Sequence, residues 1–124
     1  MIIGIGTDLV EVARIRKLLN QSGQFKERVF TSAEQQRGNT LREPDTYYAG
    51  RWAAKEACAK ALGCGIGAEC ALTDVEILNT SGNAPSMTLH GAAKKRAEKL
   101  GGKTIHVSIT HEKEYAAAFV ILES

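Results

Sequence analysis

Carboxylate side chains stand beside small residues or a lysine in two distant segments of the sequence. Asp8 ends the segment Gly4-Ile5-Gly6-Thr7-Asp8, and Glu56 precedes Lys60 by four residues within Arg51-Trp52-Ala53-Ala54-Lys55-Glu56-Ala57-Cys58-Ala59-Lys60. Carboxylates can bind divalent cations and accept protons, and an ammonium group can neutralise phosphate oxygens. These two segments are therefore the first candidates for a functional site.

The elements predicted around these residues place them at the rim of a sheet and on the face of a helix. The apolar start of the chain predicts a strand over residues 2–7, which puts Asp8 just past its end. In the second segment, helical spacing stacks four side chains on one face at successive steps of four: Tyr48, Trp52, Glu56 and Lys60. The carboxylate and the ammonium would then flank one surface.

Each segment also has a simpler interpretation. A glutamate and a lysine four residues apart form a common exposed pair on helices, worth about 0.3–0.5 kcal/mol, and Glu56 and Lys60 could be no more than that. Asp8 could cap the helix that follows, because aspartate is favoured at that position. The glycines at positions 4 and 6 do not complete a dinucleotide-binding fingerprint, since Leu9 stands where the third glycine is needed.

The rest of the chain contains helices and strands without an internal repeat or a linker, which predicts one domain over residues 1–124. Thr31 and Glu34 match a capping box that starts a short helix at Ser32, and Gly38 ends it. The other expected elements are helices over 10–21, from Pro44 to about Gly63 and over 91–100, and strands over 74–78, 86–89, 104–110 and 115–122. The last strand is apolar on both faces, which places it in the middle of the sheet.

The expected strand over 104–110 carries polar groups on one face. Its isoleucines and valine alternate toward the core, which leaves His106, Ser108 and Thr110 on the opposite face. Such a strand can simply be half-exposed. Thr110 and His111, at the exit of the strand, could instead hydrogen-bond the phosphate or ribose of a ligand.

Composition favours a cytoplasmic protein that does not enter a membrane. The 124-residue chain has no apolar run near the roughly 20 residues that a membrane-spanning helix needs, and no charged leader precedes the first strand. Cys58, Cys64 and Cys70 are six residues apart and form no C-x-x-C pair. We therefore expect reduced thiols rather than disulfides or a zinc site.

Basic residues gather on two of the expected helices, although the formal net charge is only +2. The first group is Arg14, Arg16 and Lys17, and the second is Lys94, Lys95, Arg96 and Lys99. A solvated face explains such groups without any partner. Nucleic-acid binding is disfavoured, because three Phe, three Tyr and one Trp in the whole chain leave little for base stacking.

Three segments taken together carry a family resemblance. They are Gly-Ile-Gly-Thr-Asp-Leu-Val-Glu at 4–11, Arg-Trp-Ala-Ala-Lys-Glu-Ala at 51–57 with Lys60, and Ser-Ile-Thr-His at 108–111. In this order they resemble the holo-acyl-carrier-protein synthase family of small phosphopantetheinyl transferases, and the resemblance runs from Met1 to about Leu122. Trp52 stands where the family often has Phe, and the turn at 82–85 lacks the basic residue that commonly precedes its proline.

The resemblance implies an α+β fold with a mixed, largely antiparallel sheet flanked by helices. It implies a homotrimer with coenzyme A bound in clefts between protomers. The implied enzyme transfers the 4'-phosphopantetheine group of coenzyme A to a serine of apo acyl carrier protein and releases adenosine 3',5'-bisphosphate, in support of fatty acid biosynthesis.

The same resemblance assigns expected roles to residues. Asp8 and Glu56 would hold Mg²⁺ and, with Lys60, form the catalytic group. Cofactor contacts are expected from Lys55, Lys60, Gly63, Ser108, Thr110 and His111, and contacts to the acidic carrier protein from Arg14, Arg16 and Lys17. The alternative is a non-enzymatic trimeric protein that binds a small ligand or regulates, in which Asp8 is only a cap and Glu56 and Lys60 only a surface pair.

Overall fold

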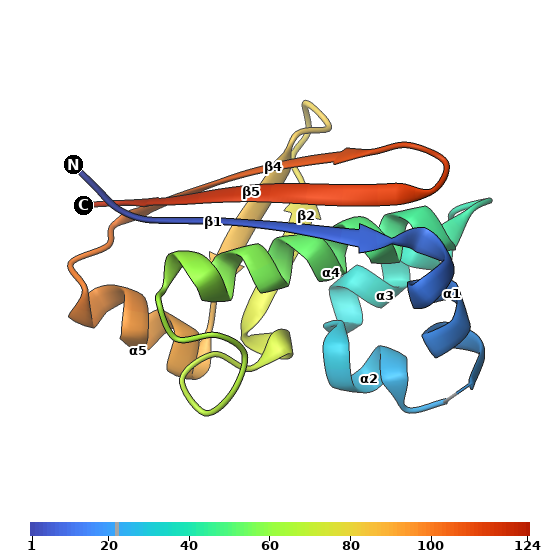
Figure 1. The fold of residues 1–124 in the computed structure, drawn as a ribbon, viewed down its shortest axis with the longest axis horizontal. Coiled ribbons are helices and arrows are strands. Elements are labelled where there is room, and N and C mark those ends of the chain that lie inside the picture. Colours follow the sequence, from blue (N-terminus) through green and yellow to red (C-terminus); the bar gives the residue numbers. More distant parts are fainter. Residues whose placement is uncertain (22) are drawn as a thin grey trace.

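A three-stranded antiparallel sheet covers a layer of helices and leaves its other face open (Figure 1). The structure, a computed structural model, describes residues 1–21 and 23–124. Strands β1 (Ile2–Glu11) and β4 (Thr104–His111) flank strand β5 (Tyr115–Glu123), in the order β1-β5-β4. The central position predicted for the last strand is confirmed, because β5 pairs along both of its edges.

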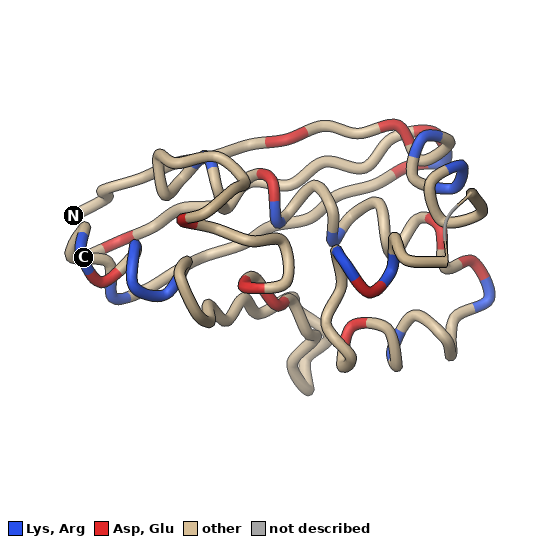
Figure 2. The backbone as a smooth tube through the Cα atoms, turned by 90° about the horizontal axis from the view of Figure 1, so that it is seen from below, with Lys and Arg blue, Asp and Glu red and all other residues tan. Residues whose placement is uncertain are grey.

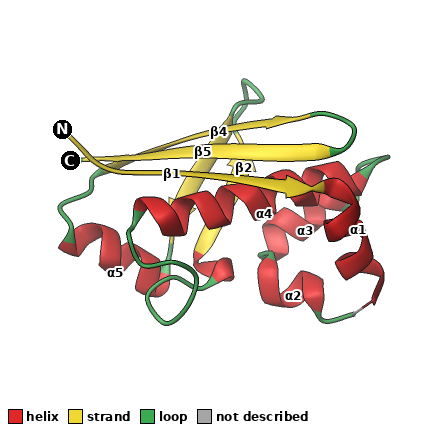
Figure 3. Cartoon of the chain, in the orientation of Figure 1, coloured by secondary structure: helices red, strands yellow, loops and turns green. Residues whose placement is uncertain are grey.

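A second antiparallel sheet has two strands, β2 (Val75–Asn79) and β3 (Pro85–Leu89). Figure 3 shows these strands running across the direction of the three-stranded sheet. The predicted α+β class with helices flanking the strands is confirmed. Throughout the described residues the strands pair only in antiparallel fashion, in two sheets rather than one mixed sheet.

Most helices begin close to the residues that the sequence predicts. They are α1 (Val12–Gln21), α2 (Phe25–Val29), α3 (Ser32–Gly38), α4 (Pro44–Ala61), α5 (Gly91–Lys99) and the 3₁₀ turn η1 (Leu72–Asp74). The capping box of α3 is confirmed, since the backbone N–H of Glu34 donates to Thr31 Oγ1 at 3.3 Å and the N–H of Thr31 donates to Glu34 Oε1 at 2.9 Å. Neither α2 nor η1 is predicted, because such short turns carry no periodic pattern. In the described part of the chain, no helix is long and apolar enough to cross a membrane.

Strand β1 is longer than the sequence predicts, and this moves Asp8 into its interior. The strand continues to Glu11, so α1 begins at Val12 rather than at Val10. The side chain of Val10 is buried, which favours an extended chain at that point. Asp8 lies opposite Ala118 of β5. The predictions that Asp8 lies past the strand end, or caps the helix, are therefore both wrong.

Helix α4 lies close against β1 because two glycines face it. A Cβ atom added at Gly6 would lie 1.9 Å from the carbonyl oxygen of Ala57, and one added at Gly4 would lie 2.0 Å from that of Ala61. Any larger residue at position 4 or 6 would push the helix away. The close approach therefore fixes the position of α4 relative to the strand that carries Asp8.

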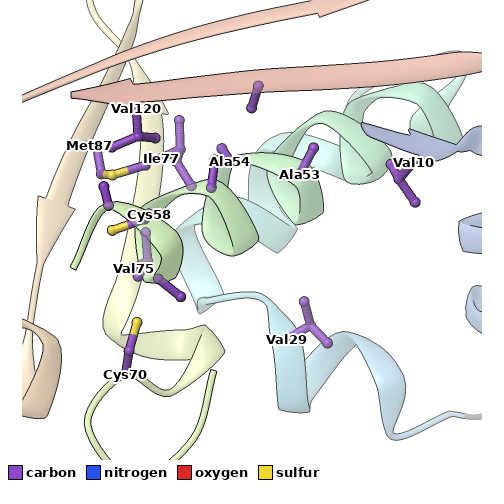
Figure 4. Close-up of a cluster of buried hydrophobic side chains, with 14 of the residues drawn as sticks. Val10, Val29, Ala53, Ala54, Cys58, Cys70, Val75, Ile77, Met87 and Val120 are labelled. Carbon is purple, nitrogen blue, oxygen red and sulfur yellow. The ribbon is translucent and has the colours of Figure 1, made fainter. Parts of the chain in front are cut away.

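The buried cluster between the two layers uses small and sulfur-containing side chains of α4. Figure 4 shows Ala53, Ala54 and Cys58 of the helix among the buried side chains of the strands. The three cysteines are free, and Cys58 and Cys70 are buried while Cys64 is half-buried. Small side chains on this face allow the sheet and helix backbones to come near each other.

The face of the three-stranded sheet that points away from α4 is apolar and uncovered. Ile5 is 60% exposed, Leu9 67% and Phe119 41%. These residues share a face, because alternate residues of a strand point to the same side and the register pairs Thr7 with Phe119 and Leu9 with Ala117. An apolar sheet face of this kind is typical of a surface that a partner covers.

Candidate active site

Asp8 and Lys60 meet where β1 lies over the C-terminal half of α4. Asp8 points to the helix side of the sheet, as does the buried Val10 two residues later. The ammonium of Lys60 lies 3.4 Å from Oδ1 of Asp8 and donates to the carbonyl oxygen of Thr7 at 2.9 Å. Within the described residues, Lys60 thus forms its ion pair with Asp8, and not with Glu56 one turn earlier in the helix.

The helix face predicted to carry four stacked side chains passes from the core to the surface. Tyr48 is fully buried, and the indole of Trp52 is half-buried and stacks on Phe25 with ring centroids 5.9 Å apart. Glu56 is half-buried and Lys60 is exposed. Tyr48 is therefore a core residue, whereas Glu56 and Lys60 lie at the surface end of the face.

Charged neighbours perturb the carboxyl group of Glu56. Partial burial raises the pKa of Glu56, and the nearby carboxylate of Asp8 raises it further, whereas Lys60 and Arg14 oppose the shift. A divalent cation would relieve the repulsion between the two carboxylates. Mg²⁺ needs only one or two carboxylates when water and substrate phosphates supply its other ligands. Asp8 and Glu56 supply two carboxylates of this kind. Among the described residues, no group of three or more potential metal-ligating side chains is present.

We expect the Glu56→Gln variant to be more stable than the unmodified protein at neutral pH when no metal is present. A carboxyl group whose pKa is raised on folding binds more protons in the folded state, so stability falls as the pH rises from the ordinary glutamate pKa through the folded value. An amide does not ionise and avoids this loss. Chemical denaturation with a chelator, from mildly acidic to neutral pH, measures the difference. If the stability of the two proteins depends on pH in the same way, the raised pKa of Glu56 is contradicted.

A cationic cavity of about 710 Å³ opens at the N-terminal half of α4. Its basic lining comes from several segments and consists of Arg37, Arg42, Arg51, His111 and Lys113, with Glu43 and Glu112 also in the wall. Cations that converge on one hollow concentrate positive potential there. The cavity therefore suits an anionic ligand such as a phosphate ester.

Arg51 is the most firmly held of these cations, and it is only 8% exposed. Its guanidinium lies 4.4 Å from the ring centroid of Tyr47 and donates to Asn79 Oδ1 at 2.8 Å. Burial lowers the pKa of Arg51, while Tyr47 and Glu34 oppose that shift. Its Nε has no partner in the described structure, so one buried donor remains available. Apart from the place of Arg51 in the second segment, no sequence signal predicts that it lines this cavity.

The polar residues predicted from the terminal hairpin do not lie beside Asp8. Ser108 and Thr110 are exposed on the outer face of β4. His111, the last residue of β4, lines the cationic cavity, and together with Thr110 it also lines a second cavity of about 440 Å³. Their predicted contacts to a cofactor therefore belong to a different part of the chain from the carboxylate pair.

One chain thus holds two separate groups of candidate residues. Arg51 and Lys60 are nine residues apart on α4, which is about 13 Å along the axis and half a turn around it. Asp8 lies on β1 and His111 on β4, the two opposite edges of the three-stranded sheet. Within a single protomer, the carboxylate pair and the cationic cavity face different directions.

Lys55 belongs to neither group. Its side chain is fully buried, and its ammonium donates to Glu34 Oε1 at 2.8 Å, to the carbonyl oxygen of Leu72 at 2.9 Å and to that of Val75. All three donors are used inside the protein. The predicted cofactor contact of Lys55 is therefore corrected: this lysine is a core residue.

Gly63 lies just beyond the C-terminal end of α4 in a left-handed conformation, with φ of +73°. Its N–H donates to the carbonyl oxygen of Lys60 at 3.0 Å, which keeps this turn beside that lysine. A side chain would be strained at this φ. The turn is well placed for the cofactor contact that the sequence predicts, and that contact stays a prediction.

The basic residues predicted to contact a protein partner lie exposed on α1. Arg14 lies over the ring of Trp52 at 5.7 Å, and Arg16 pairs with Asp45 at 2.7 Å. Figure 2 shows basic positions gathered at two ends of the molecule, on α1 and on α5. The α1 group is the nearer one to Glu56, because the charge of Arg14 lowers the pKa of the Glu56 carboxyl group.

The fold and the carboxylate pair define a known class of protein. The model of the 4'-phosphopantetheinyl transferase superfamily matches residues 4–120, so the chain belongs to this superfamily. The holo-[acyl-carrier-protein] synthase of Natranaerobius thermophilus is 45% identical over 125 residues, which covers 100% of this chain and 99% of the relative. The predicted family and enzyme class are confirmed by this similarity.

Solved structures of the same family agree with the fold. The holo-[acyl-carrier-protein] synthase of Neisseria meningitidis is 35% identical with a TM-score of 0.92, and the match covers 100% of both chains. The holo-(acyl-carrier-protein) synthase of Bacillus anthracis str. Ames, solved in complex with CoA (3',5'-ADP), is 38% identical with a TM-score of 0.86, covering 100% of this chain and 98% of that one. The fold expected from the resemblance is confirmed.

Proposed function

We propose that this protein transfers the 4'-phosphopantetheine group of coenzyme A to a serine hydroxyl of apo acyl carrier protein, and releases adenosine 3',5'-bisphosphate. The observation that carries the proposal is the meeting of Asp8, Glu56 and Lys60 in a member of this superfamily. The relative solved with CoA (3',5'-ADP) supports the same cosubstrate. With this activity we propose a role in fatty acid biosynthesis and a location in the cytoplasm.

The transfer forms one phosphorus–oxygen bond and breaks another. The serine oxygen bonds to the phosphorus that carries the pantetheine arm, and the bridging oxygen of the pyrophosphate leaves with the adenosine bisphosphate. The serine proton goes to a carboxylate oxygen of Glu56, directly or through a water molecule. The ammonium of Lys60 neutralises charge that builds on the phosphate oxygens.

Asp8 and Glu56 would hold the expected Mg²⁺. When bound, the cation supplies further neutralisation of the pyrophosphate oxygens. The half-buried position of the pair and the charge on Asp8 and Glu56 support this assignment. Lys60 is exposed at the rim of the same junction, and the third N–H of its ammonium would donate to the cofactor.

The complete site is proposed to form between neighbouring protomers of a homotrimer. The cationic cavity would hold phosphates of coenzyme A, and the carboxylate pair of the adjacent protomer would approach the pyrophosphate. Two observations support this arrangement: the two groups face different directions within one chain, and the outer sheet face is apolar and uncovered. Ser108, Thr110 and His111 would then take part in cofactor binding from the side of the cavity.

Arg14, Arg16 and Lys17 are proposed to attract the acidic carrier protein. Reversing one charge by Arg14→Glu is expected to raise the apparent KM for the carrier about tenfold at low salt, and to change the KM for coenzyme A much less. Lys17→Glu should share the effect without touching Glu56. Steady-state kinetics at several salt concentrations measures it, with Lys95→Glu on α5 as the matched control. If all three variants have the same KM for the carrier protein, α1 does not bind the carrier and its basic residues only form a solvated face.

A non-enzymatic trimer that binds a small ligand is the alternative, and one assay separates the two functions. Apo acyl carrier protein is mixed with this protein, coenzyme A and Mg²⁺, and the mass of the intact carrier is measured by mass spectrometry. Transfer adds the mass of one phosphopantetheine group, and a binding protein leaves the carrier unchanged. An unchanged mass, with the protein folded and all components present, would contradict the proposed function.

A further inference from the structure

Lys55 and Glu34 form an ion pair in which both side chains are fully buried. Oε1 of Glu34 accepts from the Lys55 ammonium at 2.8 Å and from the Thr31 N–H at 2.9 Å, and Oε2 accepts from the Ile77 N–H at 2.8 Å. Burial lowers the pKa of Lys55, and Glu34 opposes that shift. A buried pair of this kind is often no more stabilising than apolar residues of the same volume, so its presence suggests a role besides stability.

The ion pair joins three parts of the chain at one point. Glu34 lies in the first turn of α3, and Lys55 lies in the second half of α4. The lysine also donates to Leu72 of η1 and Val75 of β2, and the glutamate accepts from Ile77 of β2. Helix α4 is thereby joined to α3, η1 and β2 as well as to the three-stranded sheet.

The three consecutive residues Lys55, Glu56 and Ala57 place Glu56 between two fixed contacts. Successive side chains of a helix are about 100° apart, so Lys55 and Ala57 are about 200° apart, on nearly opposite sides of α4. The Ala57 carbonyl lies against Gly6, where a Cβ atom would be 1.9 Å away. Lys55 is fixed by its three hydrogen bonds on the other side. Glu56 is thus presented from a helix that is held on both flanks.

We propose that Lys55 and Glu34 are positioning residues, which fix the rotation of α4 about its axis and so hold Glu56 toward Asp8. Without the pair, the second half of α4 would lose the hydrogen bonds that join it to Glu34 of α3, Leu72 of η1 and Val75 of β2. The consequence for catalysis rests on the proposed function of Glu56, whereas the consequence for cation binding does not depend on transfer. Two separate readouts can therefore test the proposal.

The first test uses the double variant Glu34→Gln/Lys55→Met, which removes both charges and leaves no unpaired buried ion. Binding of Mn²⁺ alone is followed by the electron paramagnetic resonance of the free ion, and kcat is measured with saturating substrates. We expect the Mn²⁺ affinity and kcat each to fall about tenfold or more, with the KM for carrier protein unchanged. Unchanged Mn²⁺ affinity and kcat in a folded double variant would overturn the proposal.

A second variant keeps the proposal testable should the double variant not fold. Glu34→Asp retains the charge and shortens the side chain by one methylene group, which pulls Lys55 from its position or breaks the pair. The same losses, smaller in size, are expected. The matched control is Glu76→Gln, which alters a half-buried acid of β2 that hydrogen-bonds Thr31 and pairs with His90. Within the described residues, Glu76 acts on Lys55 through its charge and not through a hydrogen bond. Equal losses in this control would show a general disturbance of β2 and overturn the proposal.

Asp8→Asn separates the failure of this inference from the failure of the proposed function. If Asp8→Asn weakens Mn²⁺ binding and the Glu34 variants do not, the cation site stands and the positioning role is wrong. If the unmodified protein transfers nothing, the proposed function is wrong, and the Mn²⁺ comparison still decides the role of Lys55 and Glu34.

Discussion

Asp8→Asn is expected to reduce transfer about a hundredfold or more while leaving the fold intact. Asp8 is a partly buried carboxylate in the interior of β1, it pairs with Lys60 at 3.4 Å, and its charge acts on Glu56. An amide of the same shape keeps the packing but removes the charge that would hold Mg²⁺ and orient Lys60. The initial rate of carrier mass gain, with both substrates saturating, measures the loss.

Glu56→Gln should cost about as much, and the double variant little more than either change alone. Groups that act as one unit lose their function together, so their effects do not add. Glu98→Gln on α5 is the matched control, because it neutralises an exposed acid far along the chain. Full activity of Asp8→Asn would contradict the catalytic role of the carboxylate pair. Strictly additive losses would indicate that the two carboxylates have separate roles.

Gly6→Ala is expected to destabilise the protein by about 3 kcal/mol or more, although it adds only one methyl group. That methyl carbon would lie 1.9 Å from the carbonyl oxygen of Ala57 and 2.8 Å from the backbone nitrogen of Ala61. Both contacts are with backbone atoms of α4, so no side-chain rotation can relieve them. The helix would have to move off β1, which would also separate Glu56 from Asp8.

Thermal denaturation of Gly6→Ala, with Gly67→Ala as the control, tests the close contact between β1 and α4. A Cβ atom added at Gly67 meets nothing within 4 Å, and its φ is not in the left-handed region. Substitution at a compatible glycine reduces the freedom of the unfolded chain and should leave stability unchanged or slightly higher. Similar melting temperatures for the two variants would contradict the close approach of β1 and α4.

The order of the elements could be predicted from sequence because local chemistry marks their ends. Thr31 and Glu34 set the start of α3 by a capping box, and the apolar character of β5 on both faces placed it in the centre of the sheet. The end of β1 could not be predicted from sequence. Nothing local distinguishes a helix that starts at Val10 from a strand that runs to Glu11, since burial of Val10 and pairing with β5 decide it.

The carboxylate pair was predictable because Asp8 and Glu56 lie in recognisable segments, and their proximity follows from the contact of β1 with α4. The role of Lys55 was not predictable. Adjacent residues on a helix point about 100° apart, and only the position of α3 and β2 shows that Lys55 enters the core while Glu56 does not. The cationic cavity was missed because α3, α4 and the end of β4 contribute to it from distant parts of the sequence.

The central claim is that a transferase site forms from two protomers, and subunit mixing tests it most directly. Asp8→Asn and His111→Ala are each prepared as pure, strongly impaired proteins, mixed under conditions in which labelled subunits demonstrably exchange, and assayed by the mass gain of apo acyl carrier protein. We predict that activity returns in the mixture, because some interfaces combine an intact carboxylate pair with an intact cavity. If subunits exchange and the carrier gains no more phosphopantetheine than with either parent alone, the shared site is contradicted.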